Sequence, residues 1–384
     1  DSTGTAACVC LGHHHHDLHN TCVADSEDCD YVSFVSSTGA ISDCVSQHPN
    51  SICDDTDGTA RCLCTNNYVL QFNLASAVGH GRKGLAVGDL NTDGNLDTVS
   101  ANGANETVSI FLGACHGDEF TYDVAGISYS VQLGDMNRDG WLDVVSLNHN
   151  WPGDNVSVLL GKGDGTLEPQ SHFIVGESPK SLALGDINGD GFLDVVTANT
   201  GSHDISLLMG DGNGGLADAV HIAAGKAPFS VAIADINNDN KLDVVVGNGV
   251  DGWDIISNDE AAISLLVGNG LGGFSTPSHI HVGYIPSSLS IYEFNGDGQQ
   301  DFLVAGTGGI SIVHGGATAA IHAVTDVAVQ FMTVADMNGD GALDVLATVM
   351  AGVNETNVKV YLGDGDSGLA ETNHDLTVTS SGPE

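Results

Sequence analysis

Six short acidic segments carry the side chains of this sequence that could do chemistry. Each has a carboxylate at positions 1, 5 and 9 and asparagine at position 3, and five of the six have glycine at position 6. The segments are residues 89–97, 135–143, 186–194, 235–243, 293–301 and 336–344. Oxygen donors that converge in a tight loop suit Ca²⁺, which takes six to eight oxygen ligands, better than Mg²⁺, which keeps more of its waters.

We therefore predict up to six Ca²⁺ ions, one in each loop, bound by the side chains at positions 1, 3, 5 and 9 and the backbone carbonyl at position 7. The alternative is an Asx-rich turn without an ion, which would be reasonable for a single copy. Six copies favour the metal, because clustered carboxylates repel one another when no cation is present. The predicted ligands are Asp89, Asn91, Asp93, Asn95 and Asp97; Asp135, Asn137, Asp139, Trp141 and Asp143; Asp186, Asn188, Asp190, Phe192 and Asp194; Asp235, Asn237, Asp239, Lys241 and Asp243; Glu293, Asn295, Asp297, Gln299 and Asp301; and Asp336, Asn338, Asp340, Ala342 and Asp344.

Two loops depart from the pattern. The fourth has Asn240 where the others have glycine, and asparagine tolerates the left-handed backbone conformation better than most residues. The fifth opens with Glu293 and has Gln300 where the others have leucine. We expect the fourth site to survive and the fifth to be the weakest, since the longer side chain of Glu293 changes its reach.

The loops recur at a regular interval, which indicates a repeat fold. Their starting positions are 46, 51, 49, 58 and 43 residues apart, and a period of this size is typical of solenoids and propellers. The third repeat reads as four short apolar strands near residues 181–185, 195–198, 205–209 and 219–223, separated by turns rich in Gly, Asn and Asp. We therefore predict an all-β propeller of four-stranded blades. Six blades are favoured over seven, and Val69–Ala77 is predicted to be an additional outer strand.

The loops and their flanking strands resemble the FG-GAP family, also called VCBS repeats. The approach to the loop (Ala86-Val-Gly88, Leu184-Gly185) and the third strand Val156–Gly161 match as well, and the resemblance covers roughly residues 68–380. It implies a calcium-binding β-propeller like those of integrin α subunits. It implies little about function, because this fold serves adhesion, lectin and accessory domains alike.

Charge and composition exclude several classes of partner. The chain has 50 acidic and 9 basic residues, a formal net charge of −41, and 41% of its residues are hydrophobic. Nucleic acids and anionic membranes are bound through Lys and Arg, so neither is expected as a partner.

No apolar run approaches the roughly 18 residues needed to span a bilayer. The chain begins at Asp1 without a basic and apolar leader, so we expect a mature protein without a membrane anchor.

Cysteines distinguish the first 66 residues from the rest of the chain. The nine cysteines are Cys8, Cys10, Cys22, Cys29, Cys44, Cys53, Cys62, Cys64 and Cys115. Eight in one short segment favour a disulfide framework in a secreted protein, and the CxC pairs lack the CxxC spacing typical of zinc sites. Residues 1–66 are thus predicted to be a disulfide-stabilised arm, and residues 67–384 the propeller. The ending Cys62-Leu-Cys64-Thr-Asn-Asn-Tyr68 loosely resembles an EGF-type module. Eight cysteines allow 105 pairings, so the connectivity stays open.

Three N-glycosylation sequons begin at Asn105, Asn155 and Asn354. Each lies between the second and third predicted strands of its repeat, on the face opposite the acidic loops. Surface loops of secreted proteins are where N-glycans occur, so we predict a glycoprotein. The alternative is that these asparagines are unmodified in a bacterial protein, because the sequon is common by chance.

No catalytic motif appears in the sequence. It has no HExxH motif and no Gly-x-Ser-x-Gly in a strand–turn–helix context, so we expect a protein that is not an enzyme. The run His13–His16 could bind a transition metal, but such runs are more often solvated.

Two functions remain. The first is a secreted structural or adhesive protein of the cell surface or extracellular matrix, which assembles with other subunits into a polymer through its cysteine-rich arm. The second is a lectin-like module that binds cell-surface or matrix glycans. Trp141, Trp151 and Trp253 fall at non-equivalent positions of their repeats, which counts against a repeated sugar site.

Cys115 provides a test of the predicted disulfide framework. It lies in the turn after the third strand of the first repeat, and nine cysteines cannot all pair within one chain. Because an exposed thiol in an oxidising compartment tends to become oxidised or paired, we predict that Cys115 bonds a cysteine of the arm, in the same or a neighbouring subunit. Non-reducing peptide mapping should recover a linked pair. Recovery of Cys115 as an alkylatable thiol, with the arm cysteines paired among themselves, would refute this prediction.

Overall fold

The computed structural model describes two parts of the chain. In the first 64 residues it describes seven short strands, and from residue 84 to 379 it describes everything except residues 114–118, 151–152, 250–261, 318, 326, 353–354, 367 and 372–375. The strands of the first part are β1 (Ala7–Val9), β2 (His15–His16), β3 (Cys22–Val23), β4 (Ser33–Val35), β5 (Ile41–Cys44), β6 (Ser51–Asp54) and β7 (Arg61–Cys64). They pair as three small sheets, β1-β4-β5, β2-β3 and β6-β7. The predicted strand Val69–Ala77 lies outside the described residues.

Residues 84–379 form six antiparallel sheets, each built from one contiguous stretch of chain. Blade 1 holds β8 (Leu85–Gly88), β9 (Asp97–Asn102), β10 (Thr107–Phe111) and β11 (Glu119–Asp123), and blade 2 holds β12 (Ile127–Gly134), β13 (Asp143–His149), β14 (Asn155–Leu159) and β15 (Ser171–Ile174). Blade 3 holds β16 (Pro179–Gly185), β17 (Asp194–Asn199), β18 (Asp204–Leu208) and β19 (Val220–Ala223), and blade 4 holds β20 (Pro228–Ala234), β21 (Asp243–Asn248), β22 (Ala262–Leu266) and β23 (Ser278–His281). Blade 5 holds β24 (Pro286–Tyr292), β25 (Asp301–Gly306), β26 (Gly309–Val313) and β27 (Ile321–Thr325). Blade 6 holds β28 (Val329–Ala335), β29 (Asp344–Gly352), β30 (Glu355–Gly363), β31 (Leu369–Glu371) and β32 (Leu376–Thr379).

The four strands of each blade pair in sequence order, so the predicted all-β propeller of six four-stranded blades is confirmed. In blade 6, β31 and β32 pair with different ends of β30 and together fill the place of the outermost strand. Within the described residues the one helical element is a single 3₁₀ turn, η1 (Gly103–Asn105), between β9 and β10.

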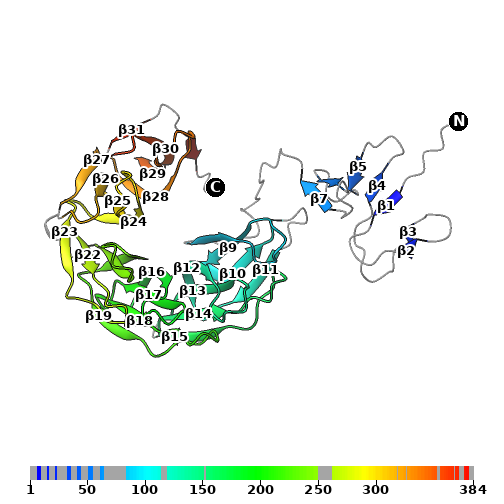
Figure 1. The fold of residues 1–384 in the computed structure, drawn as a ribbon, viewed down its shortest axis with the longest axis horizontal. Helices are drawn as coiled ribbons and strands as arrows, with labels where there is room; N and C mark the ends of the chain where they lie inside the picture. The colour runs from blue at the N-terminus through cyan, green and yellow to red at the C-terminus, as the bar shows by residue number, and fades with distance from the viewer. Residues whose placement is uncertain are drawn as a thin grey trace.

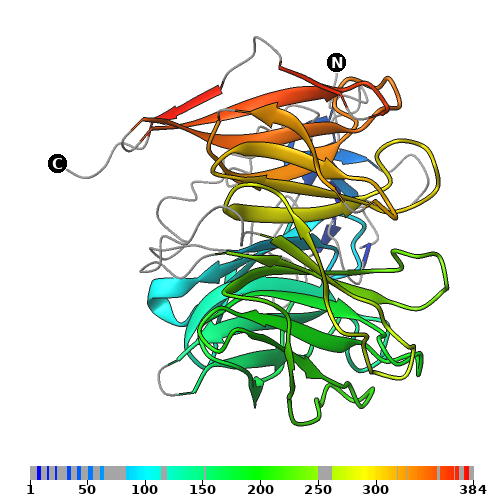
Figure 2. The ribbon, with the colours of Figure 1, turned by 90° about the vertical axis from the view of Figure 1, so that its left-hand side faces the viewer.

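Successive blades pack face to face along an arc. The innermost strand of each blade contacts the innermost strand of the next, from β8 and β12 through β24 and β28. Figure 1 shows the arc from blade 1 to blade 6, and Figure 2 shows it from the side, with blade 6 in orange and red at one end. The second strands β13, β17, β21 and β25 lie between neighbouring blades and are almost wholly buried. Each begins with an aspartate followed by at least two apolar residues, and polar residues such as Ser146 and Asn199 are buried with them.

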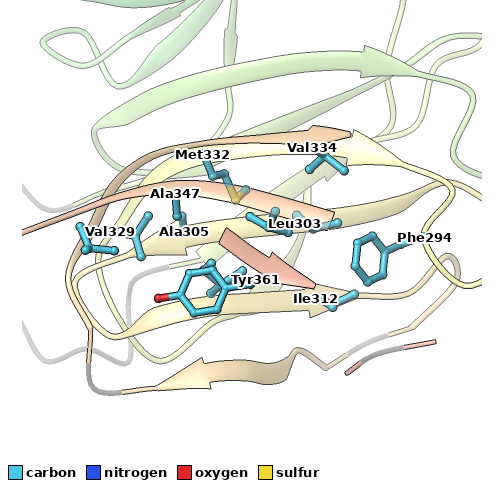
Figure 3. Packing of buried hydrophobic residues seen from close by; sticks show 12 residues of the cluster. Phe294, Leu303, Ala305, Ile312, Val329, Met332, Val334, Ala347 and Tyr361 are labelled. Carbon is cyan, nitrogen blue, oxygen red and sulfur yellow. The ribbon is translucent and has the colours of Figure 1, made fainter. Parts of the chain in front are cut away.

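The cores of the molecule lie between blades. Phe294, Leu303 and Ile312 of blade 5 pack with Met332 and Tyr361 of blade 6 in one such cluster (Figure 3). Similar clusters fill the other junctions between successive blades. Since each blade buries its apolar faces against its neighbours, the six repeats support one another's stability.

Each acidic loop joins the innermost strand of its blade to the second strand. In blade 2, for example, residues 135–142 connect β12 to β13. All six loops therefore lie at the same end of their blades, as the repeat pattern predicts.

Candidate metal centre

The backbone of each acidic loop enters the left-handed region at two positions. At position 6 the five glycines have φ of +80° to +90° and Asn240 has φ of +62°, so Asn240 takes the conformation that the other loops give to glycine. Position 4 is also left-handed, with φ of +57° at Thr92 and +61° at Arg138. This second requirement was not predicted from the sequence, because position 4 varies between glycine and larger residues.

The polar side chains of the loop accept hydrogen bonds from the loop's own amides. In blade 2, Asp135 Oδ1 accepts from Asp139 N at 3.1 Å and Asp135 Oδ2 accepts from Gly140 N at 2.9 Å. Asn137 Oδ1 also accepts from Asp139 N, and Asp139 Oδ1 accepts from Trp141 N. These bonds fold nine residues into a compact turn in which the oxygens of positions 1, 3 and 5 lie on one short segment.

The aspartate at position 9 has a different environment from the other acidic residues. In all six blades its side chain is fully buried. One carboxylate oxygen accepts from the amide of loop position 2, and the other accepts from the amide of a glycine just after the third strand, at 2.7–3.1 Å. In blade 2 these donors are Met136 N and Gly161 N. Position 9 thus ties the start of the loop and the end of the third strand to the start of the second strand.

A close backbone approach accompanies this bridge. A Cβ atom placed on Gly161 would lie 2.2 Å from the carbonyl oxygen of Leu142, and one on Gly210 would lie 2.2 Å from that of Leu193. Any side chain at this place would push the third strand away from the buried aspartate. Glycine after the third strand and aspartate at position 9 therefore belong to one structural unit.

In blades 1 to 4, electrostatics disfavour the charged form of the buried aspartate at position 9. The pKa of Asp143 is raised to about 6, chiefly by burial and to a smaller extent by the neighbouring carboxylates of Asp139 and Asp135, against the lowering effect of its two backbone hydrogen bonds. Burial likewise raises the pKa of Asp97, Asp194 and Asp243. A cation beside the loop would offset both causes, since it would compensate the buried charge and separate the repelling carboxylates.

The donor chemistry of the loops fits a hard cation. Every side-chain donor predicted for the six sites is a carboxylate or amide oxygen, the ligand type that Ca²⁺ takes. Carboxylate oxygens can accept more than one interaction, so the loop hydrogen bonds leave lone pairs for a metal. Among the residues that the structure describes, no three His, Cys, Asp or Glu side chains already form a cluster that could hold an ion.

The fifth loop differs in the way its first residue is used. Glu293 binds the amides of Gly296 and Asp297 through the single oxygen Oε1, whereas the aspartates at this position use both oxygens. In the fourth loop, Lys241 Nζ lies 3.4 Å from Asp239 Oδ2. An ammonium group beside a predicted ligand is a local cost to cation binding that the sequence pattern alone did not indicate.

The comparisons with known proteins agree with this geometry. The family described as FG-GAP-like repeat matches residues 135–197, 186–246 and 293–347, which contain five of the six acidic loops. Residues 135–246 and 293–347 are therefore FG-GAP-like repeats, and with the six four-stranded blades they fit an FG-GAP β-propeller. No curated protein matches it significantly.

Solved structures share the fold of this FG-GAP propeller at low sequence identity. A protein from Lactobacillus plantarum is 11% identical with a TM-score of 0.55, covering 93% of this chain and 94% of its own. A protein of unknown function from Desulfotomaculum acetoxidans is 11% identical with a TM-score of 0.52, covering 85% and 97%. An Agrocybe aegerita lectin that recognises non-reducing terminal N-acetylglucosamine is 17% identical with a TM-score of 0.50, covering 79% and 81%.

The predicted glycosylation sites differ in their accessibility in the propeller. Asn105 lies exposed in η1, where a glycan could be attached. Asn155 is only 2% exposed, and its Nδ2 donates hydrogen bonds to the carbonyls of Ala125 and Gly153, so this sequon is not accessible in the folded blade. Asn354, Cys115 and the side chains of the arm lie outside the described residues. No helix in the described part of the chain is long and apolar enough to cross a membrane.

Two substitutions in one loop should distinguish the buried aspartate at position 9 from the exposed aspartate at position 5. Asp143→Asn places an NH₂ group against one of two backbone amides in a fully buried site, so we expect a loss of about 1–3 kcal/mol in unfolding free energy even without calcium. The matched control Asp139→Asn changes an exposed side chain, and in EGTA its effect should stay within about 0.5 kcal/mol. Chemical denaturation in EGTA measures both. Equal stability of the two variants would contradict the role assigned to position 9.

Proposed function

We propose that this FG-GAP propeller is a secreted, non-enzymatic structural or adhesive protein of the cell surface or extracellular matrix, stabilised by up to six Ca²⁺ ions. The observation that carries the proposal is the sixfold repetition of an all-oxygen loop anchored on a buried aspartate. One such loop could be an ordinary turn. Six such loops, each at the same end of its blade, support a propeller that binds one cation per blade and is stabilised by it.

The charge of the chain is consistent with this role. Six Ca²⁺ ions would carry twelve positive charges and reduce the formal net charge from −41 to −29. Extracellular modules bind calcium with dissociation constants of about 0.1–1 mM, so sites of this kind would be filled only where calcium is abundant. The cysteine-rich arm favours the same compartment, and we propose that it joins the propeller to other subunits.

Calcium removal tests the proposal directly. At ~1 mM Ca²⁺ each site would contribute roughly 0.4–1.4 kcal/mol by mass action, and six independent sites about 2–8 kcal/mol. We expect EGTA to lower the melting temperature by roughly 5–20 °C. Calorimetry in Ca²⁺, in EGTA and in Mg²⁺ at matched ionic strength measures this shift. Melting curves that coincide in Ca²⁺ and EGTA would exclude a calcium-stabilised propeller.

A second candidate function, glycan binding, is favoured by one cavity. The innermost strands of blades 2 to 6 carry β-bulges, and in blades 2, 3 and 4 the bulged residues are Tyr129, Lys180 and Phe229. These three side chains line a cavity of about 430 Å³, together with Thr200, Ala227, Gly249, Ile285 and Pro286. The cavity lies at the end of the blades opposite the acidic loops. Lys180 Nζ lies 4.6 Å from the ring centroid of Tyr129.

Bulges turn a side chain away from the regular alternation of a strand, so equivalent bulges bring these three residues together. Aromatic faces with a few polar groups are typical of small-molecule sites. The repeated position was not visible in the sequence, because the residue types differ between blades. The structural likeness to the Agrocybe lectin supports testing a sugar ligand first.

A glycan array tests this second candidate. If the cavity binds sugar, the chain should retain specific glycans, and Phe229→Ala should reduce the apparent affinity at least about tenfold by removing one aromatic wall. Val220→Ala, which truncates an exposed apolar residue on the outer strand β19, is the matched control and should bind as the unmodified chain does. Absence of binding, or equal binding by both variants, would dismiss the lectin function and leave the structural one.

A further inference from the structure

Histidines recur on the outermost strands of four blades. Each is exposed and pairs across the strands with a buried serine of the third strand. The four are His172 of β15, His221 of β19, His279 of β23 and His322 of β27. Because these strands form the outer edges of their sheets (Figure 1), the four histidines lie on the rim of the propeller.

Blade 4 differs from the other blades because it has a second histidine two residues further along the same strand. His281 occupies the place of Ile174 in blade 2 and of Ala223 in blade 3. His279 and His281 are both exposed, whereas Ile280 between them is 6% exposed. Successive side chains of a strand point to opposite faces, so the two imidazoles lie on one face of the sheet, with their Cα atoms about 6.5–7 Å apart.

The ring of His279 is held in place from inside the blade. Its Nδ1 lies 2.8 Å from Ser264 Oγ, and this Oγ accepts a hydrogen bond from Asn248 Nδ2 at 2.6 Å. Ser264 is fully buried and Asn248 is 2% exposed. The same contact between serine and histidine occurs in blades 3 and 5, at 3.3 Å and 2.7 Å. With Nδ1 turned toward the serine, the other ring nitrogen of His279, Nε2, points away from the blade.

This arrangement suits metal ligation through Nε2. A histidine that binds a metal through one ring nitrogen donates the N–H of the other nitrogen to an acceptor, which fixes its tautomer and the orientation of its ring. A hydroxyl oxygen has two lone pairs. In the part of the chain that the structure describes, Ser264 Oγ uses one lone pair for Asn248 Nδ2, so the second can accept the proton of His279 Nδ1.

We propose that His279 and His281, which we call the rim site, chelate a divalent transition metal such as Zn²⁺, Ni²⁺ or Cu²⁺ through their Nε2 atoms. Imidazole suits these metals, whereas Ca²⁺ takes oxygen ligands, so the rim site and the acidic loops select different cations. Two protein ligands leave the remaining coordination positions to water. The net charge of −41 attracts cations to the chain. The rim site goes beyond the calcium-stabilised scaffold and does not depend on it.

Chelation distinguishes the rim site from the single histidines of the other blades. Once a metal is bound to one imidazole of the pair, the second imidazole binds it intramolecularly, which strengthens binding without any further contact. Within their own strands, His172 and His221 offer a metal one imidazole each. We therefore expect the rim site to fill at a metal concentration at least about tenfold lower than His172 or His221.

Histidine modification by diethyl pyrocarbonate, read residue by residue by mass spectrometry, tests the proposal. A bound metal protects a ring nitrogen from the reagent. The full chain is titrated with Zn²⁺ and separately with Ni²⁺, with Ca²⁺ held in excess. His279 and His281 should become protected together, at a metal concentration at least about tenfold below the one that protects His172. Since each histidine is read by itself, metal bound by the run His13–His16 does not enter the result.

Two matched variants separate chelation from binding by single imidazoles. His281→Gln removes one ligand at an exposed position, so the metal concentration that protects His279 should rise at least about tenfold. His172→Gln, at the place of His279 in blade 2, should leave the protection of His279 and His281 unchanged.

Two results would overturn the proposal. One is protection of His279 in the unmodified chain at the same metal concentration as His172, which needs no variant to fold. The other is unchanged protection of His279 in His281→Gln. Neither result bears on the melting curves in Ca²⁺ and EGTA, so the rim site and the calcium sites fail separately.

Discussion

A fully buried aspartate in each blade holds the rest of the structure in place. Its two oxygens bind one amide at the start of the acidic loop and one amide after the third strand, so three strands and the loop meet at a single carboxylate. Glycine must follow the third strand, because a side chain there would collide with the carbonyl before the aspartate. The loop then closes over this anchor and presents its remaining oxygens to solvent, where a cation can reach them. The fold and the proposed metal site thus depend on the same residue.

Much of this could be predicted from the sequence, because the same pattern of acidic loop and flanking strands occurs six times. The four strands of the third blade and the left-handed position at Asn240 both follow from local patterns of apolar and turn residues. The double hydrogen bond of Asp143 could not be predicted, since one of its donors, Gly161, is 18 residues away and is brought close by strand register. The cavity between Tyr129 and Phe229 was missed for a similar reason: bulges place these residues, and the bulged residues Tyr129, Lys180 and Phe229 share no residue type.

The central claim is that the acidic loops are metal sites, and a direct count of bound ions tests it. Equilibrium dialysis against radioactive calcium at 1–5 mM, with Mg²⁺ and monovalent salt held constant to suppress diffuse binding to the acidic surface, gives the number of ions per chain. The account predicts six saturable sites, of which the fifth, with Glu293, is the weakest. Binding that rises without saturation, or that disappears at physiological ionic strength, would show that the loops are turns without an ion and would contradict the account.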